Sequence, residues 1–200
     1  MTAFSAAGDW LAAREWRAFP FQEEVWQAIG EGRSGMLHAT TGSGKTYAVW
    51  LGMLQALLRK HSASTASGTG GKPVAQPLRA LWLTPMRALA SDTTKALAAP
   101  LADLAPHWTI GQRTGDTPSA ERARQDRRFP TVLVTTPESL TLMLSRENAR
   151  EELSSVEYVV VDEWHELIGS KRGVQAQLAI ARLWRFNPRL VVWGLSATLG

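Results

Sequence analysis

The sequence predicts an α/β fold, a doubly wound and mainly parallel sheet with helices on both of its faces. Two observations support this prediction. Short apolar, β-rich runs alternate along the chain with longer amphipathic segments. The runs "VVV" at 159–161 and "LVV" at 190–192 are continuously apolar, as expected for central parallel strands that are buried on both faces. The length of 200 residues suits a single domain with one good core.

The elements follow one another as strand, helix, strand, helix. We expect strands at Gly35–Ala39, Arg79–Thr84, Trp108–Arg113, Thr131–Thr135, Val156–Asp162 and Leu190–Leu195. We expect helices near Gln22–Gly30, Lys45–Lys60, Arg87–Ala99, Ser119–Arg127, Pro137–Leu144 and Gly173–Phe186. The segment Ser62–Pro77 is rich in Ser, Thr, Ala and Gly, which is typical of a flexible surface loop. Residues 1–20 are expected to form a helical extension, and residues 21–200 the domain.

Composition excludes several classes of protein. The chain is 44% hydrophobic and 20% charged, as soluble globular proteins are, and it contains no apolar run long enough to cross a bilayer. Its start lacks the features of a secretory signal. With no cysteine, disulfides, thiolate catalysis and cysteine-ligated zinc are excluded, and a cytosolic location fits. The net charge of +4 agrees with a polyanionic partner but is too small to identify one.

The stretch "ATTGSGKT", 39–46, follows the first predicted strand and matches a phosphate-binding loop except that Ala39 replaces the first glycine. The glycines allow positive φ and close approach to phosphate, and the following helix offers free N–H groups. Lys45 supplies charge for the β- and γ-phosphates, and the Thr46 hydroxyl suits Mg²⁺. The candidate nucleotide-binding residues here are Thr41, Gly42, Ser43, Gly44, Lys45 and Thr46. The alternative is a glycine-serine turn before a helix.

A phosphate loop needs an acidic partner for the metal, and "VVVDEWHE" supplies one. Asp162 is expected at the carboxyl end of a buried strand, where α/β sheets bind their ligands, and it suits Mg²⁺. Glu163 is the candidate base that orients and deprotonates the attacking water. The alternative for both is an acidic strand end that caps the next helix.

Taken in order, these residues resemble the first RecA-like domain of superfamily 2 helicases of the DExH type. In that family the loop commonly begins with alanine, so Ala39 is the family's own form. "FPFQ" looks like the Q motif, which implies that Gln22 reads the adenine edge, and "DEWH" is similar to motif II, which adds His165 to the catalytic candidates. "TPMRALA", "TGDT" and "TTPESL" are similar to the motifs that bind the nucleic-acid strand, and "SAT" is similar to motif III.

The strand-binding motifs also have a physical interpretation, because they fall at strand ends on the same rim as the phosphate loop. Small hydroxyls, backbone N–H groups at helix starts and one arginine suit a sugar-phosphate backbone without reading its sequence. The candidates are Thr84, Pro85, Arg87, Thr114, Gly115, Thr135, Thr136 and Pro137. The alternative is that the threonines are helix N-caps. The resemblance implies that Ser196, Ala197 and Thr198 couple the ATP state to grip on the strand; otherwise they form a plain turn.

Within the superfamily, "DEWHELIGSKRGVQ" looks most like the Lhr-like group, and Trp164 with "GSKRG" resembles the bacterial ligase-associated helicases. That resemblance implies ATP and Mg²⁺ as cofactors, 3′ to 5′ movement on single-stranded or partly duplex DNA, and a cytoplasmic role in repair beside an ATP-dependent DNA ligase and a nuclease. Two alternatives stay open. One is an RNA-directed helicase, because backbone contacts do not settle sugar identity. The other is a nucleotide-dependent clamp that binds nucleic acid without processive movement.

Helicases of this family carry a second RecA-like domain whose arginine fingers complete the ATP site, and the chain stops just after "SAT". We therefore expect these residues to be part of a larger protein. An arginine finger is worth about 10³ to 10⁵ in rate. The 200 residues alone are expected to bind nucleotide weakly, to hydrolyse it barely and to leave duplexes unwound.

Overall fold

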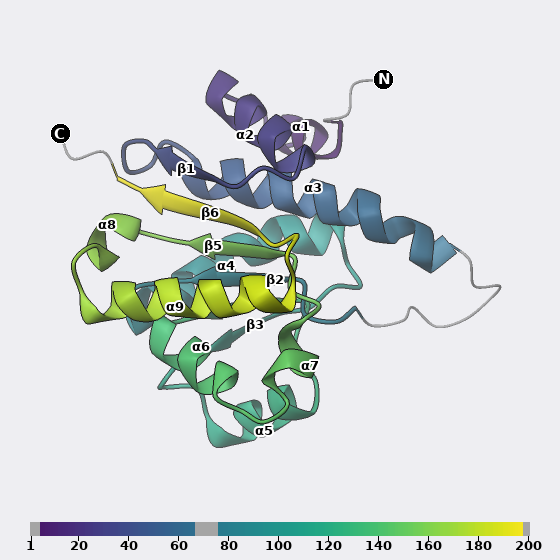
Figure 1. Ribbon diagram of the computed structural model, residues 1–200. Coiled ribbons are helices and arrows are strands. Elements are labelled where there is room, and N and C mark those ends of the chain that lie inside the picture. Colours follow the sequence, from purple (N-terminus) through teal and green to yellow (C-terminus); the bar gives the residue numbers. More distant parts are fainter. Residues whose placement is uncertain (1–4, 67–75, 198–200) are drawn as a thin grey trace.

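The computed structural model describes residues 5–66 and 76–197 (Figure 1). Its centre is a six-stranded sheet in which every paired strand runs parallel, in the order β1-β6-β5-β2-β4-β3. The strands are β1 (Gly35–His38), β2 (Ala80–Leu83), β3 (Ile110–Arg113), β4 (Val132–Thr135), β5 (Tyr158–Val161) and β6 (Val191–Ser196). The predicted parallel α/β sheet is confirmed, with all six strands within two residues of their expected ends.

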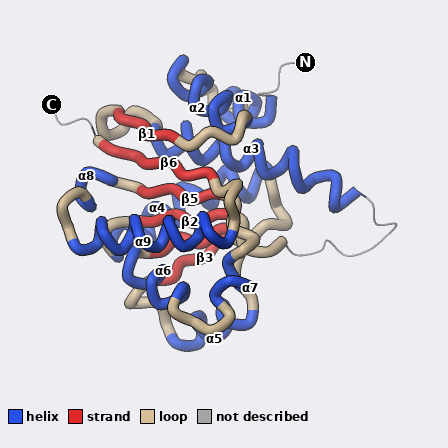
Figure 2. Tube along the Cα trace, viewed as in Figure 1, coloured by secondary structure: helices blue, strands red, loops and turns tan. Residues whose placement is uncertain are grey.

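Helices cover both faces of the sheet, as Figure 2 shows in blue around the red strands. They are α1 (Ser5–Ala12), α2 (Pro20–Gly30), α3 (Lys45–Ala66), α4 (Arg87–Leu104), α5 (Ser119–Arg127), α6 (Pro137–Leu144), α7 (Ala149–Leu153), α8 (Trp164–Leu167) and α9 (Lys171–Phe186). Helices α2, α3 and α4 pack on one face, and α6 to α9 pack on the other.

Alternate residues of each strand supply the two cores. In β5, Tyr158 and Val160 pack with α2, α3 and α4, whereas Val159 and Val161 pack with α6 to α9. All four are buried, which explains why this strand reads as an unbroken apolar run. The pattern that predicted a strand buried on both faces therefore has its expected cause.

The structure corrects the predicted helices at α3 and at two short helices, and it describes part of the N-terminal extension. Helix α3 continues to Ala66, so the expected loop at Ser62–Pro77 begins later than predicted, and its residues 67–75 lie outside the described part of the chain. In the N-terminal extension, α1 covers Ser5–Ala12 and packs on α2 and α3, while residues 1–4 lie outside the described part. Helices α7 and α8 were not predicted, because five and four residues are too short to show helical periodicity.

The strand order decides which loops meet at the carboxyl edge of the sheet. The phosphate loop follows β1, the acidic residues follow β5, and β6 lies between these two strands. The strands β2, β4 and β3, which precede the three candidate strand-binding motifs, form the other half of the same edge. Among the helices in the described ranges, none has the length and apolar character needed to span a bilayer.

Candidate nucleotide site and nucleic-acid rim

The phosphate loop joins β1 to α3 with two glycines in left-handed conformations. Gly42 has φ 79° and Gly44 has φ 88°, values at which a side chain would be strained. Helix α3 begins at Lys45, directly after the loop, so its first N–H groups face the space that the loop encloses. The Ser43 hydroxyl is buried and has no hydrogen-bond partner within the described residues. These features suit an anion that accepts hydrogen bonds from the loop.

Lys45 lies against the loop and is only 8% exposed. Its ammonium donates to the carbonyl oxygens of Ala39, at 2.7 Å, and Thr40, at 2.9 Å. Because the side chain leans back over its own loop, its charge stays at the phosphate-binding surface instead of extending into solvent.

Gln22 connects the N-terminus of α2 to the phosphate loop. Its amide oxygen accepts from the Phe19 N–H at 3.0 Å, closing a turn at the start of α2, and its amide nitrogen donates to the Gly44 carbonyl at 3.2 Å. The residue is 4% exposed. A Cβ on Gly44 would lie 2.9 Å from the Gln22 amide nitrogen, which is closer than such atoms pack. Besides its predicted contact with adenine, Gln22 therefore holds the loop in position.

Asp162 follows β5 and accepts hydrogen bonds at both carboxylate oxygens. The Trp82 indole donates to Oδ2 at 3.1 Å, and the Glu163 N–H donates to Oδ1 at 3.0 Å. Burial raises the pKa of Asp162, and the neighbouring Glu163 charge adds to the rise, while the Trp82 hydrogen bond opposes it. Glu163 itself has φ 46°, a strained conformation for a residue with a side chain, which is frequent at functional sites.

One cavity of about 650 Å³ brings the predicted nucleotide residues together. Its walls include Gln22, all of Thr41–Thr46, Asp162 and Glu163, although these residues come from three separate parts of the sequence. Sequence reasoning missed the rest of the lining, namely Leu11, Trp16, Arg17, Phe19, Tyr47 and Ala96. Trp16 and Phe19 are 49% and 56% exposed. Two aromatic residues shortly before "FQ" were the sequence signal that could have predicted this part of the cavity lining.

The donors in this cavity fit a divalent cation held together with phosphate. Asp162 and Thr46 line the same cavity, and a cation there would offset the buried negative charge of Asp162. Within residues 5–66 and 76–197, no group of three or more His, Asp or Glu residues could hold a metal alone. That donor set suits Mg²⁺, which typically binds one or two carboxylates and completes its shell with substrate phosphates and water.

His165 joins the acidic motif to the end of β6. Its Nδ1 lies 3.4 Å from the Ser196 hydroxyl, 3.4 Å from the Ala197 N–H and 3.4 Å from a Glu163 carboxylate oxygen. These contacts exist because β6 lies beside β5, so residues 31 positions apart meet at the sheet edge. Thr198, the third residue of "SAT", lies outside the described residues.

The four candidate threonines of the strand-binding motifs are buried, and their hydroxyls bond within the chain. Thr84 donates to the Thr135 and Met86 carbonyls, and Thr135 donates to the Arg113 carbonyl at 2.7 Å. The Thr114 hydroxyl accepts from the Asp116 N–H, and Thr136 caps α6 by accepting from the Ser139 N–H. They are at most 2% exposed. The expected cap is thus present at Thr136, and these four hydroxyls are engaged within the chain.

Arg87 is an exposed cation of this rim. It begins α4 and pairs with Asp116 at 2.8 Å, and 61% of its side chain is exposed. A Cβ on Gly115 would lie 2.6 Å from the Arg87 guanidinium carbon, so a side chain there would displace this exposed guanidinium. Pro137 occupies the first turn of α6 and Pro85 lies between β2 and α4. Arg87 of the motif "TPMRALA" therefore contacts the motif "TGDT" directly.

Comparison with known proteins supports the resemblance to helicases that the sequence predicts. The family model of the DEAD/DEAH box helicases matches residues 19–200. The Lhr helicase/uracil glycosylase of Escherichia coli K12 is 38% identical over 188 residues, which are 86% of this chain and 12% of that protein. An ATP-dependent helicase Lhr-Core of Sulfolobus acidocaldarius is 35% identical over 188 residues, 90% of this chain and 20% of that protein. The chain thus spans between an eighth and a fifth of these relatives.

Solved structures agree on the fold. The Mycobacterium smegmatis helicase Lhr, bound to ssDNA and AMP-PNP, superposes with a TM-score of 0.80 at 35% identity over 98% of this chain and 25% of that one. The DEAD-box helicase Mss116, at 19% identity and a TM-score of 0.77 over 100% of this chain and 39% of its own, shares the fold alone. The RecA-like helicase fold is confirmed, and the chain belongs to the DEAD/DEAH box helicase family.

Proposed function

We propose that this chain binds and hydrolyses ATP as one half of the motor of a DNA helicase or translocase. The observation that carries the proposal is the single cavity that joins the phosphate loop to Asp162 and Glu163. Binding groups and a carboxylate base converge there, as phosphoryl transfer to water requires. A protein that only binds nucleotide has no need of the base.

The residues have separate roles in this proposal. Lys45 leaves the Ala39 and Thr40 carbonyls for the β- and γ-phosphates, and the α3 N-terminus holds the β-phosphate. Asp162 and Thr46 would hold Mg²⁺, which would neutralise charge that develops on the phosphates. Glu163 orients the attacking water and takes its proton. An arginine from a second domain completes the site, in keeping with the greater length of the relatives.

The test is Glu163→Gln in the full-length protein. Hydrolysis is expected to fall at least about 100-fold, because a positioned base contributes about 10² to 10⁴ in rate. ATP affinity should stay within about twofold, because the phosphate loop is untouched. Glu166→Gln is the matched control, because Glu166 lies three residues after Glu163 and does not line the cavity. Its carboxylate contacts His165 instead. An unchanged rate in Glu163→Gln would remove Glu163 from the mechanism.

We propose DNA as the strand, on the support of the 35% identical Lhr structure that holds ssDNA. Movement 3′ to 5′, a bacterial cytoplasmic role in repair, and a DNA ligase and nuclease as partners rest on the resemblance of "DEWHELIGSKRGVQ" to the ligase-associated group. RNA is the competing strand, and a clamp without movement is the competing activity. Matched DNA and RNA oligonucleotides, compared as stimulators of ATP hydrolysis, separate the first pair. Strand displacement from a partial duplex separates the second.

A further inference from the structure

The loop Thr114–Thr117, which follows β3, is folded tightly on itself. The Thr117 hydroxyl accepts from the Thr114 N–H at 2.8 Å, and the Thr114 hydroxyl accepts from the Asp116 N–H at 3.2 Å. Thr117 also donates to the Gln112 carbonyl at 3.3 Å. The threonine side chains therefore fix the shape of this loop, which we call the TGDT loop.

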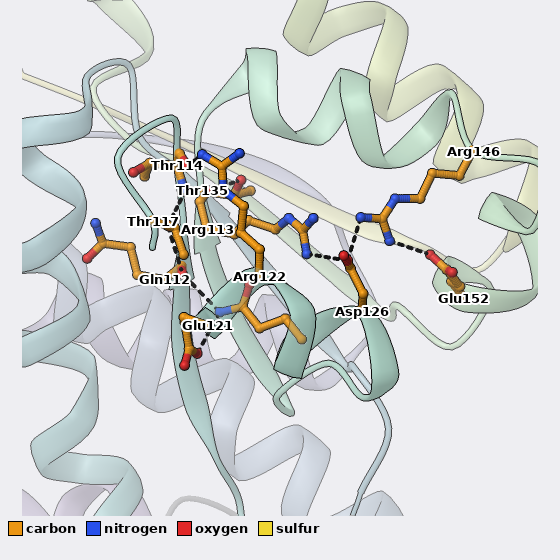
Figure 3. Close-up of polar contacts among 11 residues, drawn as sticks. Gln112, Arg113, Thr114, Thr117, Glu121, Arg122, Asp126, Thr135, Arg146 and Glu152 are labelled. Atoms are coloured by element: carbon orange, nitrogen blue, oxygen red, sulfur yellow. Dashed lines mark hydrogen bonds and ion pairs between the residues drawn. The ribbon is translucent and has the colours of Figure 1, made fainter. Parts of the chain in front are cut away.

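Arg122 of α5 binds the oxygens of the TGDT loop. One guanidinium nitrogen donates to the Thr114 carbonyl at 3.1 Å (Figure 3). The same nitrogen donates to the Gly115 carbonyl at 2.6 Å. Its Nε is buried without a partner among the described residues. The guanidinium is thus bound to two backbone oxygens of a loop that the sequence predicts to bind nucleic acid. Arg122 itself was not among the predicted nucleic-acid residues.

Helix α5 is itself anchored, which fixes the base of Arg122. Asp126 on this helix pairs with Arg113 of β3 at 2.7 Å and with Arg146 after α6, and Arg146 continues to Glu152 of α7 (Figure 3). Burial acts to raise the pKa of Asp126, but hydrogen bonds from the two arginines hold that pKa below its usual range. The carboxylate therefore stays ionised at neutral pH and keeps the helix attached.

A second arginine, Arg87, also contacts the loop. Arg87 pairs with the Asp116 carboxylate and packs against Gly115, whereas Arg122 binds the carbonyl oxygens. A loop that receives a phosphate must keep its own carbonyl oxygens away from that anion. Arg122 does this by binding two of those oxygens, and its charge also offsets theirs.

We propose that Arg122 is a positioning residue for nucleic-acid binding, which holds the TGDT loop in the conformation that accepts a strand phosphate. The proposal rests on the proposed function, because it presumes that this rim binds a strand. Arg122 acts through the loop and makes no phosphate contact of its own. This predicts a loss of affinity without a loss of salt dependence, a combination that separates positioning from direct contact.

The test measures binding of a fluorescein-labelled oligo(dT) by anisotropy at several salt concentrations, in the full-length protein. Arg122→Ala is expected to weaken binding by about 5- to 20-fold, because two hydrogen bonds from a charged donor are lost. The slope of log affinity against log salt should not change, whereas loss of a direct phosphate contact lowers it by about 0.7 for a single strand. Arg122→Lys should recover part of the affinity, since it restores a cationic donor.

Arg124→Ala is the matched control, because it removes the same charge from the same helix. Arg124 is 74% exposed at its side chain and pairs only with Glu121 on its own helix within the described residues. Its binding should stay within about twofold of wild type, since an exposed pair contributes little. Hydrogen exchange gives a second readout: the Thr114, Asp116 and Thr117 amides should exchange faster in Arg122→Ala and not in Arg124→Ala.

The outcomes separate the two proposals. If the wild-type protein does not bind oligo(dT), the proposed function is wrong, and exchange alone still decides whether Arg122 holds the loop. If wild type and Arg122→Ala bind equally and exchange equally, the role of Arg122 is wrong. A slope lowered by about 0.7 would also overturn it, since Arg122 would then contact phosphate directly. Unchanged ATP affinity in each variant verifies that the rest of the fold is intact.

Discussion

Replacing Gly44 with alanine probes how closely the phosphate loop and Gln22 depend on each other. Gly44 has φ 88°, and a Cβ there would lie 2.9 Å from the Gln22 amide nitrogen. Gly42 offers a matched control in the same loop: its φ is 79°, and no atom lies within 4 Å of the place its Cβ would take. Gly42→Ala therefore adds backbone strain alone, whereas Gly44→Ala adds strain and displaces Gln22.

The magnitudes follow from these contacts. A left-handed conformation costs a residue with a side chain about 1–2 kcal/mol. The gain from a stiffer unfolded chain, about 0.4–1 kcal/mol, is the same for both substitutions and cancels in their comparison. Displacing Gln22 breaks its two hydrogen bonds, to the Phe19 N–H and the Gly44 carbonyl, at about 0.5–1.5 kcal/mol each. Gly44→Ala should thus lower the free energy of unfolding by about 1–3 kcal/mol more than Gly42→Ala.

A double-mutant cycle with Gln22→Ala isolates the coupling, measured by urea unfolding at 25 °C. Gln22→Ala should cost about 1–3 kcal/mol in the wild type but close to nothing in Gly44→Ala, where its hydrogen bonds are already broken. In Gly42→Ala it should cost as much as in the wild type. If Gln22→Ala cost the same in all three backgrounds, Gln22 would not support Gly44, and the geometry would have no energetic consequence.

Two further predictions concern buried carboxylates. The Trp82 hydrogen bond lowers the pKa of Asp162 against the rise from burial, so Trp82→Phe should raise that pKa further. Because Asp162 must be ionised to hold Mg²⁺, the acid limb of the pH–rate profile should move to higher pH, and an unmoved limb would contradict the assignment. Burial acts to raise the pKa of Glu157, but Lys60 and His61 hold that pKa below its ordinary value of 4.5. The ionised carboxylate therefore stabilises the fold above pH 4.5, and this stabilisation is lost as the pH falls through the lowered pKa. Glu157→Gln should therefore cost about 1–3 kcal/mol at pH 7, with the gap to wild type closing in acid; a pH-independent gap would assign the loss to packing.

The sequence predicted the elements that repeat a clear pattern. Continuous apolar runs located β5 and β6 correctly, because strands buried on both faces admit few polar residues. Spacing located the loop between β1 and α3, since Gly42 and Gly44 can take the left-handed conformations that this turn before Lys45 requires. The short helix α8 was missed, because four residues after a left-handed Glu163 show no periodicity. Helix α3 was predicted too short, because Ser and Thr in its last turn are as common in loops.

The partners of the site residues were beyond sequence reasoning, because each lies far away along the chain. Trp82 donates to Asp162 across 80 positions, and no local pattern marks that tryptophan among nine. Arg122 is one of several arginines in α5, and only the fold shows that it alone faces the TGDT loop. The buried hydroxyls show the same limit: a threonine at a strand end predicts a cap or a ligand equally well until its partners are known.

The strand order gives the site its division of labour. Strands β1, β6 and β5 place the candidate nucleotide residues, and β2, β4 and β3 place the candidate nucleic-acid rim, so the two halves meet where β5 pairs with β2. At that boundary the Asp162 N–H donates to the Leu83 carbonyl at 2.8 Å, and Trp82 donates to the Asp162 carboxylate. Thr84 follows β2 directly, and Arg87 begins the next helix, α4. The hydrogen bonds of Asp162 thus reach β2, which carries the first candidate nucleic-acid motif, and this is a physical reason for the two proposed activities to share one sheet edge.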